Sequence, residues 1–317
     1  MKKNYLFVIL VLIIFAGVFW YLTKASNSKP SEQDNSQTEV VRTSQKEETK
    51  TQINGKIVYV AKQNNFTINT YNFTDKKIET LFTDKNEAFK VKAIAGQLTN
   101  NRIALFTEGD QNKILAVSLD GIAKTEVLFD NIGNPDLAAV SPDGKNLAFV
   151  FFSNVERDYG YNLYLRTNDN KEEALVRSDD AITNLVWNGN ATKLLYLDKS
   201  SPKEIRAYDF ALRKSVSFSD FENEVFAFNF ANGDLFASLI KNSDSVIMKI
   251  NSEGSGMSEI ATITKTKAFD IFIEEANMAF LSSAGSEPVS SGKIKIDNKD
   301  GIINSEEANN IIGWLKN

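Results

Sequence analysis

The chain has 317 residues, of which 42% are hydrophobic and 24% charged, with a net charge of −5 and a pI near 5.1. An acidic chain of this length accommodates one large domain with accessory segments, and it lacks the concentrated basic surface that a nucleic-acid partner needs. The sequence contains no cysteine and no histidine, which excludes disulfides, zinc–thiolate sites and every Ser-His-Asp or Cys-His mechanism.

The N-terminal segment has the pattern of a membrane anchor. Residues 5–22 contain no charged residue and are rich in Leu, Ile, Val and Phe, and a helix of about 20 such residues spans a bilayer. Lys2 and Lys3 favour a cytoplasmic N-terminus. We therefore predict a cytoplasmic tip and transmembrane helix over 1–23, a single pass through the cytoplasmic membrane, and export of everything after it to the periplasm or cell surface. The alternative is a cleaved signal peptide, but the apolar run is long for one and the cleavage site is poor.

A polar segment follows the anchor. Residues 24–53 consist mainly of Ser, Gln, Glu, Lys, Thr and Asn, and only Val40-Val41 interrupts the polarity. Such a composition cannot bury a core. We predict a disordered stalk over 24–53 and a folded domain over 54–317.

The folded domain shows a repeating pattern of short apolar runs. Their starts recur at intervals of roughly 41 to 47 residues, the spacing of four-stranded propeller blades. The runs begin at Ile57, Ile103, Leu147, Leu194, Leu235 and Met278. A strand and a turn precede most of them, and strands with alternating polarity follow. We predict that each run is the second strand of a blade and is buried on both faces, whereas the outer strands are partly solvated.

The clearest copy of the repeat is Ser141-Pro142-Asp143-Gly144 followed by the apolar run Leu147–Phe152. Pro142 presets the first corner of a turn, and Gly144 can take the positive φ that later turn positions require. The run is typical of a strand buried on both faces.

The two ends of the domain complement each other. No inner strand precedes Ile57, and the terminal segment Asn310–Leu315 resembles the inner strand Ile182–Trp187, with Trp314 in the place of Trp187. We expect the C-terminal strand to complete the first blade and close the ring, because closure removes an exposed sheet edge. The predicted fold is therefore an all-β, six-bladed β-propeller closed by its C-terminal strand and preceded by one transmembrane helix.

The segment 141–150, with Asn162-Leu163-Tyr164-Leu165 behind it, resembles the repeat of TolB-type (WD40-like) β-propellers. The resemblance implies an extracytoplasmic propeller of a kind that often binds proteins. The same repeat occurs in the propellers of prolyl-oligopeptidase-like peptidases, but this chain has neither a catalytic histidine nor room for a hydrolase domain. No functional residue carries over from the resemblance.

Two connections are candidates for a binding rim. The long connection 154–160 contributes Arg157, Asp158 and Tyr159, and the connection before the next inner strand contributes Asp179 and Asp180. Strand counting places both at the same end of the propeller, and long loops on rigid scaffolds often carry binding residues. The alternative is a solvated loop without a function.

The segment 296–307 has part of the pattern of a calcium-binding loop, including Asn298, Asp300, Gly301 and Glu307. Ile296 stands where the first ligand should be Asp, and the flanking residues suit strands better than helices. The alternative is a polar hairpin turn between outer strands. We therefore assign no metal site and expect no cofactor.

Two functions remain open. The first is a non-catalytic scaffold that binds a protein or a cell-envelope polymer. The second is a surface glycan-active enzyme that uses paired carboxylates in the propeller channel, which histidine-free chemistry permits. Two carboxylates facing each other in the channel would favour the enzyme, and a channel lined with Phe, Ser and Asn would favour the scaffold.

Overall fold

The computed structural model describes residues 40–41, 56–62, 66–72, 77–83, 89–109, 111–119, 125–231, 233–274, 277–283, 292–298, 301–308 and 310–315. The predicted anchor at 1–23 and most of the predicted stalk at 24–53 lie outside these residues. Within the described part of the chain, no helix has the length and apolar character to cross a membrane. Residues 38–317 form one compact unit.

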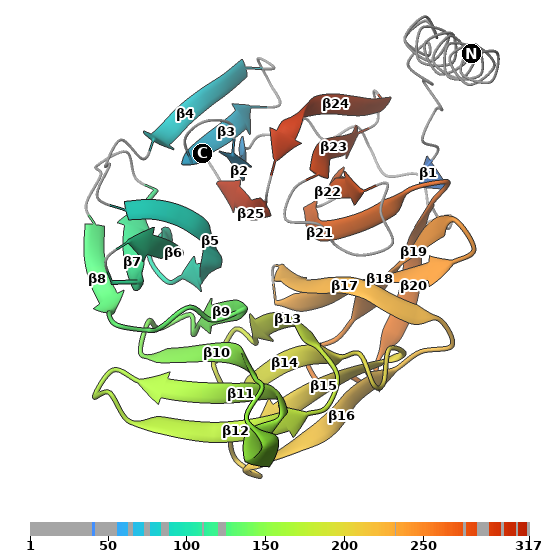
Figure 1. The fold of residues 1–317 in the computed structure, drawn as a ribbon. Helices are drawn as coiled ribbons and strands as arrows, with labels where there is room; N and C mark the ends of the chain where they lie inside the picture. Colours follow the sequence, from blue (N-terminus) through green and yellow to red (C-terminus); the bar gives the residue numbers. More distant parts are fainter. Residues whose placement is uncertain are drawn as a thin grey trace, which may run out of the picture. The chain divides into compact units, whose positions relative to one another are not determined.

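This unit is a β-propeller, as predicted. Its described strands form six sheets around a central axis (Figure 1), five sheets with four strands and one with five. From the centre outward, the first sheet contains β25 (Asn310–Leu315), β2 (Lys56–Lys62), β3 (Phe66–Asn72) and β4 (Lys77–Thr83). The second contains β5 (Phe89–Leu98), β6 (Arg102–Gly109), β7 (Lys113–Ser118) and β8 (Thr125–Phe129). The third contains β9 (Leu137–Val140), β10 (Asn146–Ser153), β11 (Gly160–Thr167) and β12 (Glu172–Ser178).

The remaining sheets repeat this order. The fourth contains β13 (Ile182–Trp187), β14 (Lys193–Asp198), β15 (Glu204–Asp209) and β16 (Lys214–Asp220). The fifth contains β17 (Glu224–Ala231), β18 (Asp234–Lys241), β19 (Asp244–Ile250) and β20 (Met257–Ile263), with β1 (Val40–Val41) outside β20. The sixth contains β21 (Lys267–Glu274), β22 (Asn277–Ser283), β23 (Gly292–Asn298) and β24 (Gly301–Ala308).

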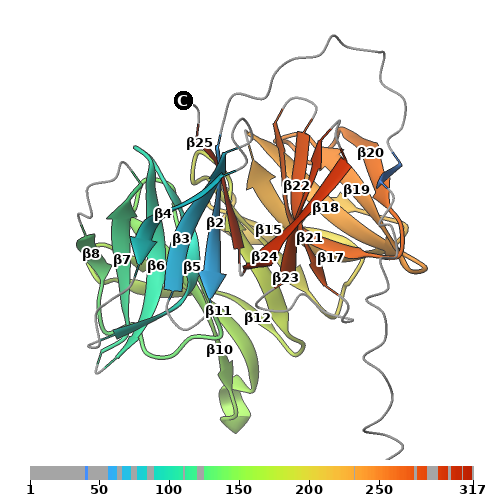
Figure 2. The ribbon, with the colours of Figure 1, turned by 90° about the horizontal axis from the view of Figure 1, so that it is seen from above.

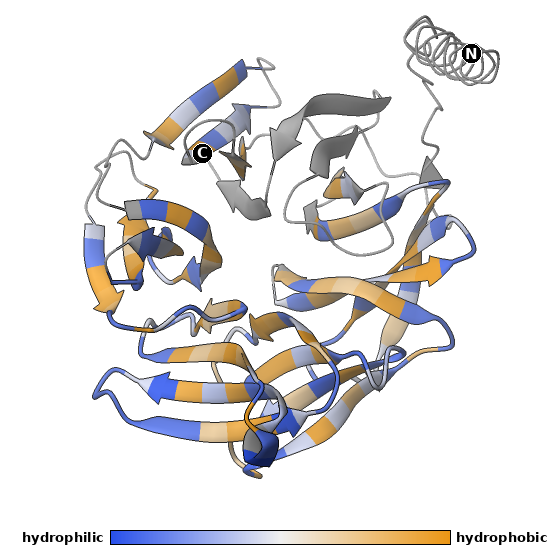
Figure 3. Ribbon diagram, in the orientation of Figure 1, coloured by the Kyte–Doolittle hydropathy of each residue, from blue (hydrophilic) through white to orange (hydrophobic). Residues whose placement is uncertain are grey.

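The hydrophobic core lies between neighbouring sheets. The second strands β6, β10, β14 and β18 each contain a run of at least four buried residues, whereas the outer strands β4, β8, β12 and β20 begin with exposed residues. Figure 3 shows the same division, with hydrophilic residues at outer turns such as the one between β11 and β12. Apolar residues of adjacent sheets form joint clusters; one of them contains Val58, Ile68, Ile103 and Leu105. The predicted burial of the second strands is confirmed, except at the end of the run Leu147–Phe152, where burial stops at Val150.

The C-terminal strand pairs with the first strand of the propeller. β25 lies antiparallel to β2, with Trp314 opposite Ile57 and Ile311 opposite Tyr59. Ile57 and Tyr59 are completely buried. The predicted completion of the first sheet by the C-terminus is therefore confirmed.

The two valines that interrupt the polar segment form a short strand. In β1, Val40 pairs with Ile263 and Val41 with Thr262 at the outer edge of β20. β-Branched residues favour extended backbone. The other residues of the predicted stalk lie outside the description.

The turn between β9 and β10 has the predicted geometry. Gly144 has φ of 76°, and its N–H donates to the carbonyl of Ser141 at 2.8 Å. The Asp143 carboxylate accepts hydrogen bonds from the Ser141 hydroxyl at 2.6 Å and from the Lys145 N–H at 3.1 Å. Partial burial opposes ionisation of Asp143, but these hydrogen bonds and the charge of Lys145 hold its pKa below the usual value.

The next sheet preserves this turn although its sequence differs. Asn188 occupies the place of Ser141, and Ala191, with φ of 57°, occupies the place of Gly144. The Ala191 N–H donates to the Asn188 carbonyl at 3.0 Å, and the Lys193 N–H donates to Asn188 Oδ1 at 2.8 Å. An alanine therefore adopts a left-handed conformation that costs an L-residue about 1 to 2 kcal/mol.

We predict that Gly144→Ala and Ala191→Gly change the free energy of unfolding in opposite directions. Gly144→Ala should lower the free energy of unfolding by about 1 kcal/mol, because the added Cβ meets only Leu128 at an ordinary distance of 3.9 Å and the penalty is conformational. Ala191→Gly should raise it by up to about 1 kcal/mol, because strain relief exceeds the added entropy of the unfolded chain. Urea denaturation of both variants measures these changes.

Gly189→Ala is the matched control, because no atom lies within 4 Å of a Cβ there and the residue does not have positive φ. Its unfolding free energy should stay equal or rise slightly. Equal stability of Gly144→Ala and the wild type would contradict the strain argument.

Candidate functional site

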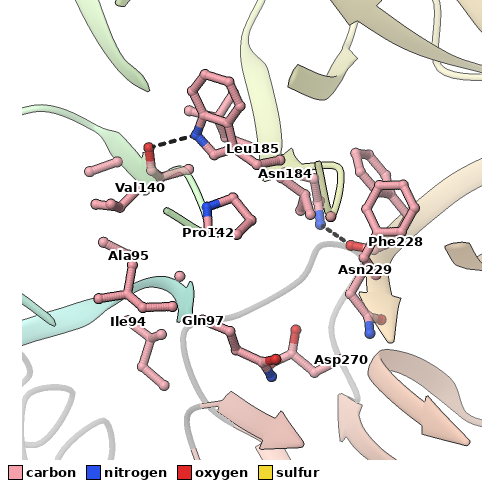
Figure 4. A pocket seen from close by; sticks show the side chains of 18 of the residues that line it. Ile94, Ala95, Gln97, Val140, Pro142, Asn184, Leu185, Phe228, Asn229 and Asp270 are labelled. Atoms are coloured by element: carbon pink, nitrogen blue, oxygen red, sulfur yellow. Dashed lines mark hydrogen bonds between the residues drawn. The ribbon is translucent and has the colours of Figure 1, made fainter. Parts of the chain in front are cut away.

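A cavity of about 470 Å³ opens at one end of the central channel. It lies between the ends of the inner strands β5, β9, β13, β17 and β21 and the turns that follow several of them (Figure 4). Its size is within the usual range for small-molecule sites. The lining includes polar and aromatic side chains, among them Gln97, Asn184, Trp187, Phe228, Asn229 and Asp270.

Hydrogen bonds join neighbouring sheets around this cavity. Trp187 Nε1 donates to the Ala139 carbonyl at 3.0 Å, and Asn184 Nδ2 donates to the Phe228 carbonyl at 3.4 Å. The Asn229 side chain pairs with the backbone of Ile271 in β21, donating to its carbonyl at 2.6 Å and accepting from its N–H at 2.8 Å. Side chains that line the cavity thus also bind one inner strand to the next.

The polar groups of the lining are mainly amides. Of the lining residues that the structure describes, Asp270 is the one carboxylate. It is half-buried on β21, and the side chains of Gln97 and Asp270 point toward each other across the cavity (Figure 4). A carboxylate opposite an amide can orient a polar ligand by hydrogen bonding, but a glycosidase mechanism of the usual kind needs a second carboxylate.

The predicted rim lies at the opposite end of the channel. Arg157 and Asp158 belong to a short 3₁₀ turn, η1 (Glu156–Asp158), and Tyr159 follows it in the connection from β10 to β11. Asp179 and Asp180 connect β12 to β13. The cavity instead lies beside the turns that follow the inner strands, near Pro142 and Gly189. Because β10 runs away from the Pro142 turn to the β10–β11 connection, the rim and the cavity lie at opposite ends of the propeller.

The structure brings the two rim segments together. A Cβ on Gly160 would lie 2.5 Å from the Ser178 carbonyl oxygen and 3.5 Å from Asp179 Cα, so only glycine allows this approach. Arg157, Tyr159, Asp179 and Asp180 are exposed, and the side chain of Asp158 lies outside the description. The prediction that both connections share one end of the propeller is confirmed.

Sequence reasoning missed two residues of this rim. Arg177 donates hydrogen bonds to the carbonyls of Arg157 at 3.1 Å and Tyr159 at 2.9 Å. Phe152, which was predicted to be buried with the rest of its apolar run, is 45% exposed. The burial ends at Val150 because the hairpin continues beyond the neighbouring sheets (Figure 2). The available signal for such a projection was the length of the apolar run Leu147–Phe152, which exceeds that of the runs Ile103–Phe106 and Leu194–Leu197.

The candidate calcium loop is part of a hairpin. β23 and β24 pair antiparallel, with Asn298 opposite Gly301, and residues 299–300 lie outside the description. In the described part of the chain, no cluster of three or more carboxylate, histidine or cysteine residues could hold a metal ion. Strands β23 and β24 flank the turn, as expected for the polar hairpin that the sequence analysis gave as the alternative.

Known structures share this fold. No protein-family model matches the chain, and no curated protein matches its sequence. TolB from Acinetobacter baumannii is 14% identical, with a TM-score of 0.56 over 82% of this chain and 66% of that one. A putative TolB from Agrobacterium tumefaciens is 12% identical, with a TM-score of 0.55 over 81% and 93% of the two chains. A chain of a nidogen/laminin complex is 9% identical, with a TM-score of 0.54 over 82% and 97%.

These TM-scores show that the chain shares the β-propeller fold of TolB. They carry no function, because propellers host many. The chain spans 66% of the Acinetobacter TolB structure.

We predict that the Asn229 side chain holds the inner strands β17 and β21 together. Asn229→Ala leaves the N–H and carbonyl of Ile271, a buried residue, without these partners, and should lower the free energy of unfolding by about 1 to 3 kcal/mol. Urea denaturation measures the loss. Asn154→Ala, at an exposed position, is the control and should change stability by less than about 0.5 kcal/mol. Equal stabilities of the two variants would contradict the assignment.

Proposed function

We propose that this protein is a membrane-tethered, extracytoplasmic β-propeller that acts as a non-catalytic binding or scaffold module. Its partner is a protein or a cell-envelope polymer. Counting each sheet as one blade gives a six-bladed ring, closed by the C-terminal strand. Likeness to TolB supports a binding role by analogy of fold.

The observation that carries the proposal is the composition of the cavity. The side chains of Trp187, Asn184 and Asn229 are hydrogen-bonded to neighbouring sheets, and Asp270 is the single carboxylate among the described lining residues. Side chains fixed in this way suit recognition, because they offer contact area and their remaining polar atoms without losing much freedom on binding. The enzyme alternative needs a pair of carboxylates across the bound sugar.

The membrane part of the proposal is supported by the sequence of residues 1–24. The charge-free run 5–22 follows Lys2 and Lys3, which favour a cytoplasmic N-terminus.

We predict that protease added outside the cytoplasmic membrane cuts the segment 26–52 of the membrane-bound chain. The released product should be a soluble fragment that contains the propeller. Immunoblotting of membrane and supernatant fractions measures the release. Cleavage that occurs only after the membrane is permeabilised would contradict an external propeller.

Binding and catalysis are separated by one conservative substitution. The full chain, tagged at its N-terminus, is crosslinked in cells, and retained molecules are identified for the wild type and for Asp270→Asn. Asparagine tolerates the left-handed conformation of Asp270, whose φ is 48°, so the fold should be kept. A scaffold retains a discrete partner and hydrolyses no envelope glycan in either form. Hydrolysis of envelope glycan by the wild type, lost in Asp270→Asn, would instead establish the enzyme.

A further inference from the structure

An exposed aromatic cluster covers the tip of the β10–β11 hairpin. We call residues 152–161 the hairpin tip. Three of the seven large hydrophobic residues exposed in the described part of the chain belong to it, namely Phe152, Val155 and Tyr159, the last two more than half exposed. The Phe152 ring lies 5.5 Å from the ring of Tyr159 and 5.0 Å from that of Tyr161. Apolar residues gathered on a projecting hairpin (Figure 2) indicate an interaction surface.

The hairpin tip is held in one conformation by its neighbours. The guanidinium of Arg177 donates to two of its carbonyls, and the Val155 N–H donates to the Ser153 hydroxyl at 3.3 Å. Gly160 packs its backbone against Ser178. Aromatic side chains on a fixed backbone lose little conformational entropy on binding, and such residues are frequent hot spots.

The charges around the cluster are mainly negative. The hairpin tip and residues 177–180 carry four carboxylates, on Glu156, Asp158, Asp179 and Asp180, against the two guanidinium groups of Arg157 and Arg177. Glu156, Asp179 and Asp180 are exposed. Arg177 keeps its positive charge when it donates to backbone carbonyls, so four carboxylates against two guanidinium groups leave a net charge of −2, and the field that an approaching partner meets is negative.

We propose that the hairpin tip binds a protein segment in which an apolar or aromatic anchor is flanked by lysine or arginine side chains. The anchor packs on Phe152, Val155 and Tyr159, and the cations face Glu156, Asp179 and Asp180. The inference rests on the proposed binding function and specifies the chemistry of the partner. A bilayer fits less well, because anionic headgroups would be repelled by the same carboxylates, and a second copy would bring like charges together.

The test uses the full chain in lipid nanodiscs, with empty nanodiscs as the blank. The probe is a fluorescent peptide of alternating Lys and Phe, compared with one in which Glu replaces Lys and one in which Ser replaces Phe. Fluorescence anisotropy measures the dissociation constants at low and high salt. The Lys/Phe peptide should bind more tightly than both others, and its affinity should fall as salt screens the charges.

Two double variants divide the interaction into its parts. Phe152→Ser with Tyr159→Ser should weaken the Lys/Phe peptide by at least about tenfold, because the anchor loses its contact surface. Asp179→Asn with Asp180→Asn should weaken it by roughly two- to tenfold and flatten the salt dependence. Leu212→Ser with Met257→Ser removes two exposed apolar residues elsewhere and should leave the affinity unchanged.

Several results would overturn the proposal. They are equal affinity for the Lys and Glu peptides, and unchanged binding by the Phe152/Tyr159 variant. They also include co-sedimentation with vesicles of phosphatidylcholine and phosphatidylglycerol, or dimerisation in analytical ultracentrifugation, if the Phe152/Tyr159 variant abolishes either one.

The cellular crosslinking experiment distinguishes failure of the hairpin-tip proposal from failure of the proposed binding function. A partner retained equally by the wild type and the Phe152/Tyr159 variant leaves the binding function intact and removes the hairpin tip from it. A chain that retains no partner in any form removes the binding function itself.

Discussion

The pairing of β25 with β2 joins the two ends of the propeller chain, and the core depends on this pairing. Apolar side chains pack between sheets, so every sheet needs a neighbour on both faces. Ile57 and Tyr59 of β2 share one cluster with Phe269 of β21 and Phe280 of β22. An open ring would expose the apolar face of the first sheet together with a strand edge, and both promote aggregation. A chain without cysteine has no disulfide to hold such a ring together, so strand pairing at the seam supplies the closure.

The inner strands add a second constraint, which also shapes the cavity. Trp187, Asn184 and Asn229 each use a side-chain polar group to bind the backbone of a neighbouring inner strand. These side chains also form part of the cavity wall. The wall is therefore rigid, and the polar atoms left for a ligand are fewer than the lining composition suggests. Rigidity of this kind favours selective recognition.

The two ends of the channel differ in chemistry. One end holds the cavity, with amides, aromatic rings and the carboxylate of Asp270. The other carries the hairpin tip, with exposed aromatic rings beside carboxylates. Because strands in a blade alternate in direction, each connection belongs to one end, and an insertion between β10 and β11 can change one surface without altering the other. A scaffold can use this separation to bind two partners at once.

Much of the fold follows from local patterns in the sequence. Three or more consecutive apolar residues mark each second strand, because a strand between two sheets is buried on both faces. The Pro142-Asp143-Gly144 turn needs positive φ, which glycine supplies, and the likeness of Asn310–Leu315 to Ile182–Trp187 predicts the seam. These features depend on residues close in sequence or on a repeated pattern, so they are readable without coordinates.

Only the tertiary structure decided which distant residues meet. The sequence at Ala191 gives no signal of a left-handed residue; the flanking strands impose that conformation. Arg177 reaches the carbonyls of Arg157 and Tyr159, and Asn229 reaches Ile271, because strand register and packing between sheets bring them together. The exposure of Phe152 likewise depends on where neighbouring sheets end. The sequence by itself determined the ring of sheets and the end at which the rim lies. The cavity and the shape of the hairpin tip were decided by side-chain contacts across sheets. Such contacts join residues that are far apart along the chain, and their separation in sequence does not indicate whether they meet in the fold.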